Sequence, residues 1–361
     1  MLPYTAIALS GGIDSLVAAA LLVDQGRRVI ALHFVNGYEP EIGPPGALCK
    51  LDSDDSIHTH IRYNLQPLAD QLGIPLYIID LRYDFKRCVV DYFIKTYAQG
   101  KTPNPCLVCN PIIKFDLLWR KAQDYGADCI ATGHYARIQP DAQGYLQLLR
   151  GMDRTKDQSY FLARLSRVQL AKAVLPLGAL TKSQVKTIAR KKGLMALTNR
   201  ESQDVCFIPN GTYSDFLMRQ PGVNFQAGPI EDLQGNLIGH HEGLHRFTIG
   251  QRKGINCPAS HPYYVVKIEK SRNCLIVGTK NDLLRKSCRV NQINWLIPPP
   301  QSPIQVMIKV RYRHRAVAST VTPLGPDQAQ VTFKKPEPAV TPGQGAVFYH
   351  DEQVLGGGWI E

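Results

Sequence analysis

The chain has 361 residues, of which 44% are hydrophobic and 20% are charged, and its formal net charge is +12. A chain of this length and composition can bury cores in two or three domains, which excludes wholesale disorder. The basic excess favours a polyanionic partner, first nucleic acid and second a membrane surface, although a basic enzyme without such a partner gives the same number. The N-terminus lacks a secretory pattern and the apolar run at residues 16–23 is too short to span a bilayer, so we expect a cytoplasmic protein.

The first 130 residues alternate between strand-like and helix-like patterns. Apolar runs at residues 6–9, 29–35, 75–81 and 129–132 are typical of buried parallel strands, and helix-like segments separate them. This alternation predicts an α/β fold with a doubly wound parallel sheet. Because ligands of such sheets bind at the carboxyl ends of the strands, the residues that directly follow these runs are candidate ligand sites.

A Gly-rich loop, residues 10–15 (Ser-Gly-Gly-Ile-Asp-Ser), follows the first apolar run and precedes a helix-like segment. Backbone N–H groups at such a turn can hold a phosphate or pyrophosphate. The loop lacks the Lys-Ser/Thr ending of a P-loop, which favours chemistry at the α-phosphate of a nucleotide over γ-phosphate transfer. Asp14 is a candidate Mg²⁺ ligand, and Ser10 and Ser15 are candidate phosphate donors; the alternative is that Asp14 and Ser15 cap the helix.

The chain contains nine cysteines, which in a cytosolic protein indicate reactive or metal-bound thiols rather than a disulfide framework. Cys106 and Cys109 form one Cys-x-x-Cys pair, which is compatible with half a zinc site, a redox pair or a cluster site. The nearby charges of Lys101 and Lys114 favour thiolates there. A lone cysteine before a phenylalanine, as at Cys206, is more often a core residue than a catalytic one. We expect a structural role for the remaining six cysteines, at positions 49, 88, 129, 257, 274 and 288.

The composition changes along the second half of the chain. Residues 150–200 look helical and hold twelve Lys/Arg against two Asp/Glu, which favours contact with a nucleic-acid backbone over a merely solvated helical face. From about residue 208, short alternating runs indicate a small β-rich or mixed module. Runs at residues 304–310, 316–321, 329–333 and 346–349 predict a small antiparallel barrel. We therefore expect three domains: residues 1–207, 208–287 and 288–361.

Ordered motifs along nearly the whole chain resemble those of the tRNA-specific 2-thiouridylases, which replace the C2 oxygen of the wobble uridine with sulfur. Beside the loop at residues 10–15, these motifs lie at residues 102–105, 109–110, 113–115, 131–135, 156–161, 202–207, 248–254, 311–313 and 341–344. The resemblance implies an N-terminal PP-loop domain (ATP pyrophosphatase-type, adenine nucleotide alpha hydrolase-like), a small central domain and a C-terminal antiparallel β-barrel.

The resemblance also implies roles for single residues. Cys109 matches the family's nucleophile, and Cys206 matches its persulfide carrier. The positions that match its ATP site, with Mg²⁺ accompanying the nucleotide, are Ala8, Leu9, Ser10, Gly11, Gly12, Ile13, Asp14, Ser15, Phe34 and Gly133. The positions that match its tRNA contacts are Asn104, Pro105 and Cys106 at the target base, and His134, Lys156, Asp157, Gln158, Arg311, Tyr312 and Gln344. Implied partners are tRNAs that accept lysine, glutamate and glutamine, and a sulfur-donor protein or inorganic sulfide.

Cys106 departs from the family pattern, because many members carry an aspartate there as general acid/base. A thiol and a carboxyl differ by several pKa units, so a thiol would shuttle protons differently. Alternatively, Cys106, Cys109 and Cys206 hold a [4Fe–4S] cluster whose open iron binds a sulfide; we weigh this hypothesis evenly against a persulfide relay. Rival functions are a 4-thiouridine or lysidine synthase type of enzyme, a non-catalytic RNA-binding protein and a structural-zinc protein.

Overall fold

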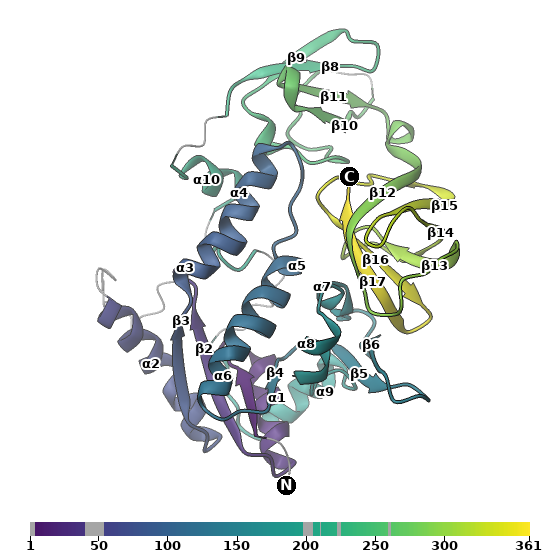
Figure 1. Cartoon of the computed structure of the whole chain (residues 1–361). Coiled ribbons are helices and arrows are strands. Elements are labelled where there is room, and N and C mark those ends of the chain that lie inside the picture. The colour runs from purple at the N-terminus through teal and green to yellow at the C-terminus, as the bar shows by residue number, and fades with distance from the viewer. Residues whose placement is uncertain (1–3, 40–53, 198–204, 210, 222–224, 259–260) are drawn as a thin grey trace. The chain divides into compact units, whose positions relative to one another are not determined.

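The computed structural model describes residues 4–39, 54–197, 205–209, 211–221, 225–258 and 261–361 (Figure 1). The chain divides into two compact units. The first unit comprises Met1–Cys88, Val108–Pro209 and Glu352–Val354, and the second comprises Val89–Leu107, Asn210–Asp351 and Leu355–Glu361.

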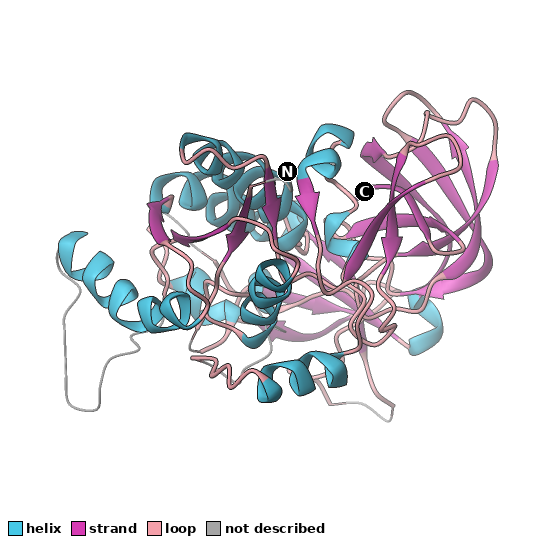
Figure 2. Cartoon of the chain, turned by 90° about the horizontal axis from the view of Figure 1, so that it is seen from below, coloured by secondary structure: helices cyan, strands magenta, loops and turns pink. Residues whose placement is uncertain are grey.

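A five-stranded parallel sheet in the order β3-β2-β1-β4-β7 forms the centre of the first unit. Its strands are β1 (Thr5–Ala8), β2 (Val29–Val35), β3 (Leu76–Asp80), β4 (Cys129–Ala131) and β7 (Ala173–Val174). The α-helices of this unit are α1 (Ile13–Asp24), α2 (Asp54–Gln71), α3 (Arg82–Phe85), α6 (Leu118–Asp124), α7 (Ser159–Leu162), α8 (Arg167–Lys172) and α9 (Lys182–Lys191). Figure 2 colours helices and strands differently. The expected α/β fold is confirmed.

The strands form where the sequence is apolar on both faces. Residues 29–32 of β2 are all buried, as a parallel strand covered on both sides requires. One core of the unit joins β1 and β2 to α1, α2 and α9, with Leu16, Leu65 and Val185 among its buried members. The core thus fixes the helix that follows the Gly-rich loop against the sheet.

Residues 136–150 form an antiparallel hairpin that the sequence analysis missed. Its strands are β5 (Ala136–Pro140) and β6 (Leu146–Arg150), and Leu149 also pairs with Gln353. The helical expectation for residues 150–200 holds for α7, α8 and α9, which alternate there with loops and the two residues of β7.

Two π-helical segments, η1 (Lys86–Val90) and η2 (Asn110–Leu117), continue directly into α4 (Asp91–Ala98) and α6. The short helix α5 (Cys106–Cys109) precedes η2. π-Helical turns are rare and occur frequently at functional sites. No pattern in the sequence indicated them.

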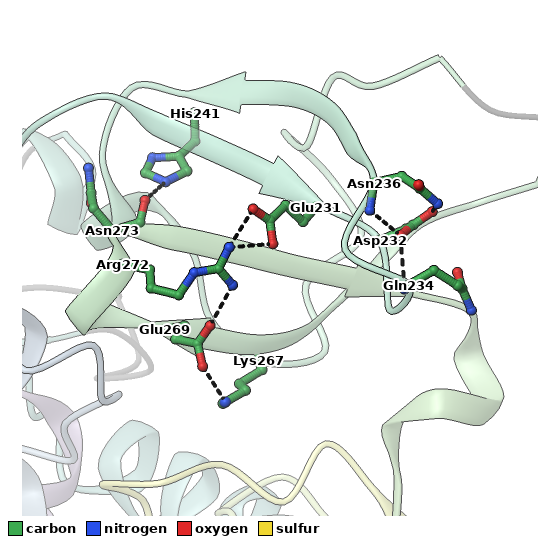
Figure 3. Close-up of polar contacts among 9 residues, drawn as sticks. All are labelled: Glu231, Asp232, Gln234, Asn236, His241, Lys267, Glu269, Arg272 and Asn273. Carbon is green, nitrogen blue, oxygen red and sulfur yellow. Dashed lines mark hydrogen bonds and ion pairs between the residues drawn. The ribbon is translucent and has the colours of Figure 1, made fainter.

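The second unit contains a four-stranded sheet in the order β10-β11-β8-β9. Its strands are β8 (Gly228–Glu231), β9 (Leu237–His241), β10 (Tyr264–Glu269) and β11 (Cys274–Gly278), and the helices of this region are α10 (Tyr213–Met218), η3 (Leu244–Arg246), η4 (Lys270–Arg272) and η5 (Lys280–Leu283). Figure 3 shows Arg272 between Glu231 of β8 and Glu269 of β10. Its guanidinium donates to both carboxylate oxygens of Glu231 at 2.7 and 2.9 Å and to Glu269 at 3.1 Å. Lys267 extends this row of ion pairs by donating to Glu269 at 2.6 Å.

A closed antiparallel barrel completes the second unit and confirms the expected C-terminal barrel. Its strands follow the order β12-β15-β14-β13-β16-β17, and β12 pairs with β17 to close it. They are β12 (Leu284–Trp295), β13 (Ile304–Lys309), β14 (Val317–Pro323), β15 (Ala329–Pro338), β16 (Gly345–His350) and β17 (Gln353–Ile360). Among the helices of the described residues, none is both long and apolar enough to cross a membrane.

His245 is an unusual buried group of the second unit. It stacks on Phe225 with ring centroids 3.8 Å apart, and neither ring nitrogen has a hydrogen-bond partner among the described residues. Desolvation lowers the pKa of His245 to about 4, and the charges of Arg246 and His241 act in the same direction. The folded chain therefore takes up this proton near pH 4, whereas the unfolded chain takes it up near the ordinary value of 6.5.

We expect the free energy of unfolding to fall as the pH is lowered from 6.5 to about 4, because the unfolded state binds the proton first. His245→Phe keeps a ring beside Phe225 and removes the titrating group, so it should reduce this loss in urea unfolding across that pH range. Gln234→Asn, at an exposed position of the same unit that carries no titrating group, is the control and should leave the pH slope as it is. A slope in His245→Phe equal to that of the wild type would contradict the assignment.

Candidate active site

The Gly-rich loop joins β1 to α1, and its Ser15 side chain makes hydrogen bonds to the backbone of the same loop. Ser15 Oγ donates to the carbonyl of Gly12 at 2.9 Å and accepts from the backbone N–H of Ser10 at 3.2 Å. Gly12 is the N-cap of α1, and no side chain caps that helix. Among the described residues, neither Asp14 nor Ser15 caps the helix, which favours the phosphate-binding alternative for the first-turn amides of α1.

Two glycines allow backbone segments to approach the loop closely. Gly11 has φ +78°, and a Cβ there would lie 2.8 Å from Leu197 Cδ1. Gly133, in the loop after β4, would place a Cβ 2.9 Å from the carbonyl carbon of Asp14 and 3.0 Å from the nitrogen of Ser15. The structure thus brings Gly133 to the start of α1, where the family resemblance places the nucleotide.

Asp14 has partners that the sequence analysis missed. Its Oδ1 accepts from Tyr135 Oη at 2.7 Å and from Lys182 Nζ at 2.7 Å, and its Oδ2 accepts from Lys182 Nζ at 2.8 Å. A cation so close to both oxygens disfavours direct coordination of Mg²⁺ by Asp14. The carboxylate fits a role in positioning the loop better than a role as a metal ligand.

The segment 153–158 packs against these two partners. The backbone N–H of Tyr135 donates to Gln158 Oε1 at 3.0 Å, and the N–H of Gln158 donates to the carbonyl of Tyr135 at 2.8 Å. Asp157 is buried, and its Oδ1 accepts from the N–H groups of Gly151 at 3.1 Å and Ser159 at 3.0 Å. Asp157 and Gln158 therefore hold this segment in shape within the first unit.

An aromatic cluster connects the end of β2 with the Cys206 segment. Phe34 lies 6.3 Å from Phe85 between ring centroids, and Phe85 lies 5.8 Å from Phe207. Tyr38 contacts both Phe85 at 6.3 Å and Phe207 at 5.9 Å. Because Phe207 is buried and directly follows Cys206, this cluster connects the cysteine to Phe34, which the family resemblance assigns to the ATP site.

Cys206 is a free thiol that is exposed to solvent but surrounded by protein on most sides. Desolvation raises the pKa of this thiol, and the charge of Lys114 on η2 lowers it in part. The same lysine acts on His134, whose pKa desolvation holds well below its usual value. His134 is thus a buried neutral imidazole, and its Nδ1 lies 2.7 Å from Thr132 Oγ1.

In the second unit, Gln344 holds the loop that precedes Cys106. Its Nε2 donates to the carbonyls of Thr102 at 3.1 Å and Pro103 at 2.9 Å. The N–H of Thr102 donates in turn to the carbonyl of Pro342 at 3.0 Å. Asn104 and Pro105 are buried and Cys106 is half-buried. The residues expected at the target base therefore form a tightly held loop.

Cys109 lies buried at the end of α5, and Asn110 begins η2 beside it. Asn110 Nδ2 donates to the carbonyl of Phe161 at 3.0 Å, which ties the start of η2 to α7. Within the described residues, no three His, Cys, Asp or Glu side chains are grouped as a metal site, so the expected cluster on Cys106, Cys109 and Cys206 has no support in the structure.

The basic segment 150–200 is partly neutralised within the first unit. Arg154 pairs with Glu352, Lys182 with Asp14 and Lys192 with Asp24, so its net field is weaker than the count of charges indicates. In the second unit, Arg311 and Tyr312 follow β13 and are half-buried, with Lys309 Nζ 5.4 Å from the Tyr312 ring centroid.

Several expectations fall outside the described residues. They concern residues 202–204 of the motif at 202–207, residues 198–200 of the basic segment, and Cys49. Of the cysteines expected to be structural, Cys274 is buried, and Cys88, Cys129, Cys257 and Cys288 are half-buried.

Three domain models match the chain: the tRNA methyl transferase HUP domain at residues 4–210, the tRNA methyl transferase PRC-barrel domain at residues 214–279 and the Aminomethyltransferase beta-barrel domain at residues 285–360. The tRNA-specific 2-thiouridylase MnmA of Desulfosudis oleivorans is 48% identical over 358 residues, which cover 99% of this chain and 95% of that protein. Proteins of the same name from Geobacter metallireducens and Magnetococcus marinus are each 44% identical, over 98% of this chain and over 96% and 98% of theirs.

Gln344→Leu should loosen the loop at residues 102–105, since two carbonyls lose their donor. We expect a loss of about 1–2 kcal/mol in the free energy of unfolding and faster amide exchange across residues 101–107. Hydrogen exchange followed by mass spectrometry measures which amides exchange faster and by how much. Gln305→Leu, at an exposed position of the same barrel, is the control. Equal exchange in the two variants would contradict the role of Gln344.

Lys114→Met should raise the pKa of the Cys206 thiol further, because the charge that lowers it is removed. The midpoint of iodoacetamide alkylation at Cys206, measured by mass spectrometry as a function of pH, should therefore move to higher pH. Lys121→Met removes an exposed lysine that pairs with Asp124 in α6 and should leave the midpoint in place. If both variants keep the wild-type midpoint, the Lys114 charge does not act on this thiol.

Proposed function

The chain belongs to the tRNA-specific 2-thiouridylase family, and we propose that it replaces the C2 oxygen of the tRNA wobble uridine with sulfur at the expense of ATP. It is a tRNA-uridine 2-sulfurtransferase. The observation that supports the proposed mechanism is that the Gly-rich loop follows β1, while Phe34 on the neighbouring strand β2 is connected through Phe85 to Phe207, the residue after Cys206. A phosphate-binding turn beside a solvent-accessible thiol suits a reaction that activates an oxygen and then delivers sulfur.

The first step activates the base. The C2 oxygen attacks the α-phosphorus of ATP, the bond between the α- and β-phosphates breaks, and pyrophosphate leaves. The amides at the start of α1 receive the pyrophosphate, while Phe34 and Gly133 border the nucleotide. Mg²⁺ bound with the nucleotide supplies charge neutralisation for the phosphates. Asp14 serves this step by holding the loop, since Lys182 occupies both of its oxygens.

The second step transfers sulfur. Cys206 accepts sulfur from a donor as a persulfide, and the terminal sulfur attacks C2, so that AMP leaves with the former oxygen. Cys109 then attacks Cys206 Sγ, which frees the thiolated base and leaves a Cys109–Cys206 disulfide for an external thiol to reduce. The exposure of Cys206 suits delivery of persulfide sulfur by a donor protein. Inorganic sulfide belongs to the cluster alternative, in which it reaches the activated base without becoming a persulfide.

The tRNA is held by residues from both units in this proposal. Lys156, Asp157 and Gln158 contribute from the first unit, where His134 also responds to the tRNA. The second unit contributes Arg311, Tyr312 and Gln344, and Asn104, Pro105 and Cys106 meet the target base. We expect tRNAs for lysine, glutamate and glutamine as substrates, in the cytoplasm, and domains at residues 1–207, 208–287 and 288–361.

Cys106 replaces the family's acidic residue, so this thiol takes the place of the proton shuttle at the target base. No step is routed through an iron–sulfur cluster, because the described thiols are not grouped as a metal site. Iron and sulfide quantitation on protein purified without oxygen, wild type against Cys106→Ala, tests the cluster alternative. Stoichiometric iron that is lost in the variant would favour the cluster over the relay.

Cys109→Ser and Cys206→Ser should each abolish formation of 2-thiouridine, measured by mass spectrometry of tRNA nucleosides. Both variants should keep tRNA-stimulated exchange between ATP and pyrophosphate, because adenylation precedes sulfur transfer. Cys88→Ser, at a half-buried thiol of the first unit, is the control and should retain both activities.

The rival functions give other outcomes in the same assays. A 4-thiouridine or lysidine synthase would change a different nucleoside, and a non-catalytic RNA-binding protein would show no tRNA-stimulated exchange. Full thiolation by Cys206→Ser would contradict the relay.

A further inference from the structure

Asp14 lies at the second position of α1, next to the amides that would receive pyrophosphate. Its carboxylate is held from two sides, by the Tyr135 hydroxyl at 2.7 Å and by the Lys182 ammonium at 2.7 and 2.8 Å. Tyr135 and Lys182 are both buried. Because three short contacts converge on one carboxylate, any movement of Tyr135 or Lys182 moves the start of α1.

Lys182 occupies a helix position that is unfavourable for a lysine. It is the first residue of α9, whose first turn carries no acidic residue, and a cation at the positive end of a helix is unfavourable. A buried lysine also loses hydration. At the opposite end of the same two helices, Lys192 pairs with Asp24 at 2.7 Å, but there both side chains are more exposed. The unfavourable position of Lys182 therefore points to a role beyond packing α9 on α1.

Tyr135 and Lys182 each also make hydrogen bonds to the segment 153–158. Tyr135 exchanges two hydrogen bonds with Gln158, one at 3.0 Å and one at 2.8 Å. The backbone N–H of Lys182 donates to Asp153 Oδ2 at 2.9 Å, and Asp153 Oδ1 accepts from Thr155 Oγ1 at 2.6 Å. Two separate chains of contacts therefore run from this segment to Asp14, one through Tyr135 and one through Lys182.

We propose that Tyr135 and Lys182 are positioning residues that couple tRNA binding at residues 156–158 to ATP binding at the Gly-rich loop. This inference rests on the proposed function, which assigns residues 156–158 to tRNA. A tRNA that holds the segment in the arrangement described here also holds Tyr135 and Lys182, and through them Asp14 and the first turn of α1. ATP and tRNA then each tighten the binding of the other by the same factor.

The coupling factor is the ratio of the dissociation constants for a non-hydrolysable ATP analogue without and with saturating tRNA. Isothermal titration of the full-length wild type, with analogue and with tRNA as the varied ligand, should give the same factor in both directions, about 5 to 150. A wild type in which tRNA leaves the affinity for the analogue unchanged overturns the proposal.

Tyr135→Phe removes one contact with Asp14 and leaves the backbone bonds to Gln158 in place. Lys182→Met removes the ammonium and keeps much of the apolar stem. Each variant should lower the coupling factor by about five-fold or more. Lys182→Arg retains a cation that can bond both carboxylate oxygens and should recover part of the factor.

The control variant is Lys192→Met, which breaks the matched pair with Asp24 at the other end of α1 and α9. It should keep the wild-type coupling factor. A purely structural role for Tyr135 and Lys182 would weaken analogue binding equally with and without tRNA. An unchanged factor in both Tyr135→Phe and Lys182→Met therefore overturns the proposal, even where their affinities fall.

Formation of 2-thiouridine by the wild type is measured separately. A wild type that shows coupling but forms no 2-thiouridine overturns the proposed function while supporting the coupling between tRNA and nucleotide. A wild type that forms 2-thiouridine without coupling overturns only the role assigned here to Tyr135 and Lys182.

Discussion

The close approach of backbone to backbone at the start of α1 is the constraint on which the active site depends. A Cβ at Gly133 would lie 2.9 Å from the carbonyl carbon of Asp14, and the backbone N–H of Leu197 donates to the carbonyl of Gly11 at 3.0 Å. The loop is therefore confined by its neighbours, and its amides are set before a nucleotide arrives. Preorganised donors need little rearrangement as charge develops on a departing pyrophosphate, which is how such sites stabilise a transition state. Tyr135 and Lys182 bond to Asp14 and also to residues of the segment 153–158, so this segment contributes to holding the start of α1 in place.

A glycine also permits a close backbone approach in the second unit, at the loop of residues 102–105. Gly343 has φ +88°, and a Cβ there would lie 2.8 Å from the carbonyl oxygen of Thr102. The turn at residues 341–344 can therefore lie directly against residues 102–103, and Gln344 completes the contact with two hydrogen bonds. In both units a glycine permits the approach and a polar side chain then fixes it. The loops that carry the chemistry owe their shape to distant parts of the chain rather than to their own sequence.

Local patterns predicted what depends on local sequence. The strand at residues 29–35 was placed at its true bounds because a buried parallel strand is apolar throughout, and the barrel followed from alternating runs. The hairpin at 136–150 and the π-helices carry no such pattern. Tyr135 and Lys182 lie 121 and 168 residues from Asp14, so no motif could pair them with it. The residues next to Asp14 in the sequence indicate only a metal ligand or a helix cap, because its two partners lie far away along the chain.

The two thiols of the proposed relay differ in a way that suits different tasks. Cys206 is exposed, but desolvation raises the pKa of its thiol, and a nearby cation counteracts part of that rise. Lys114 supplies that charge, while Glu39 opposes it. Lys114 lies on η2, the π-helical segment that begins directly after Cys109. Lys114 and the N-cap residue Cys109 therefore belong to one helical segment, so the cation that acts on Cys206 and the second thiol of the proposed relay are held by the same element.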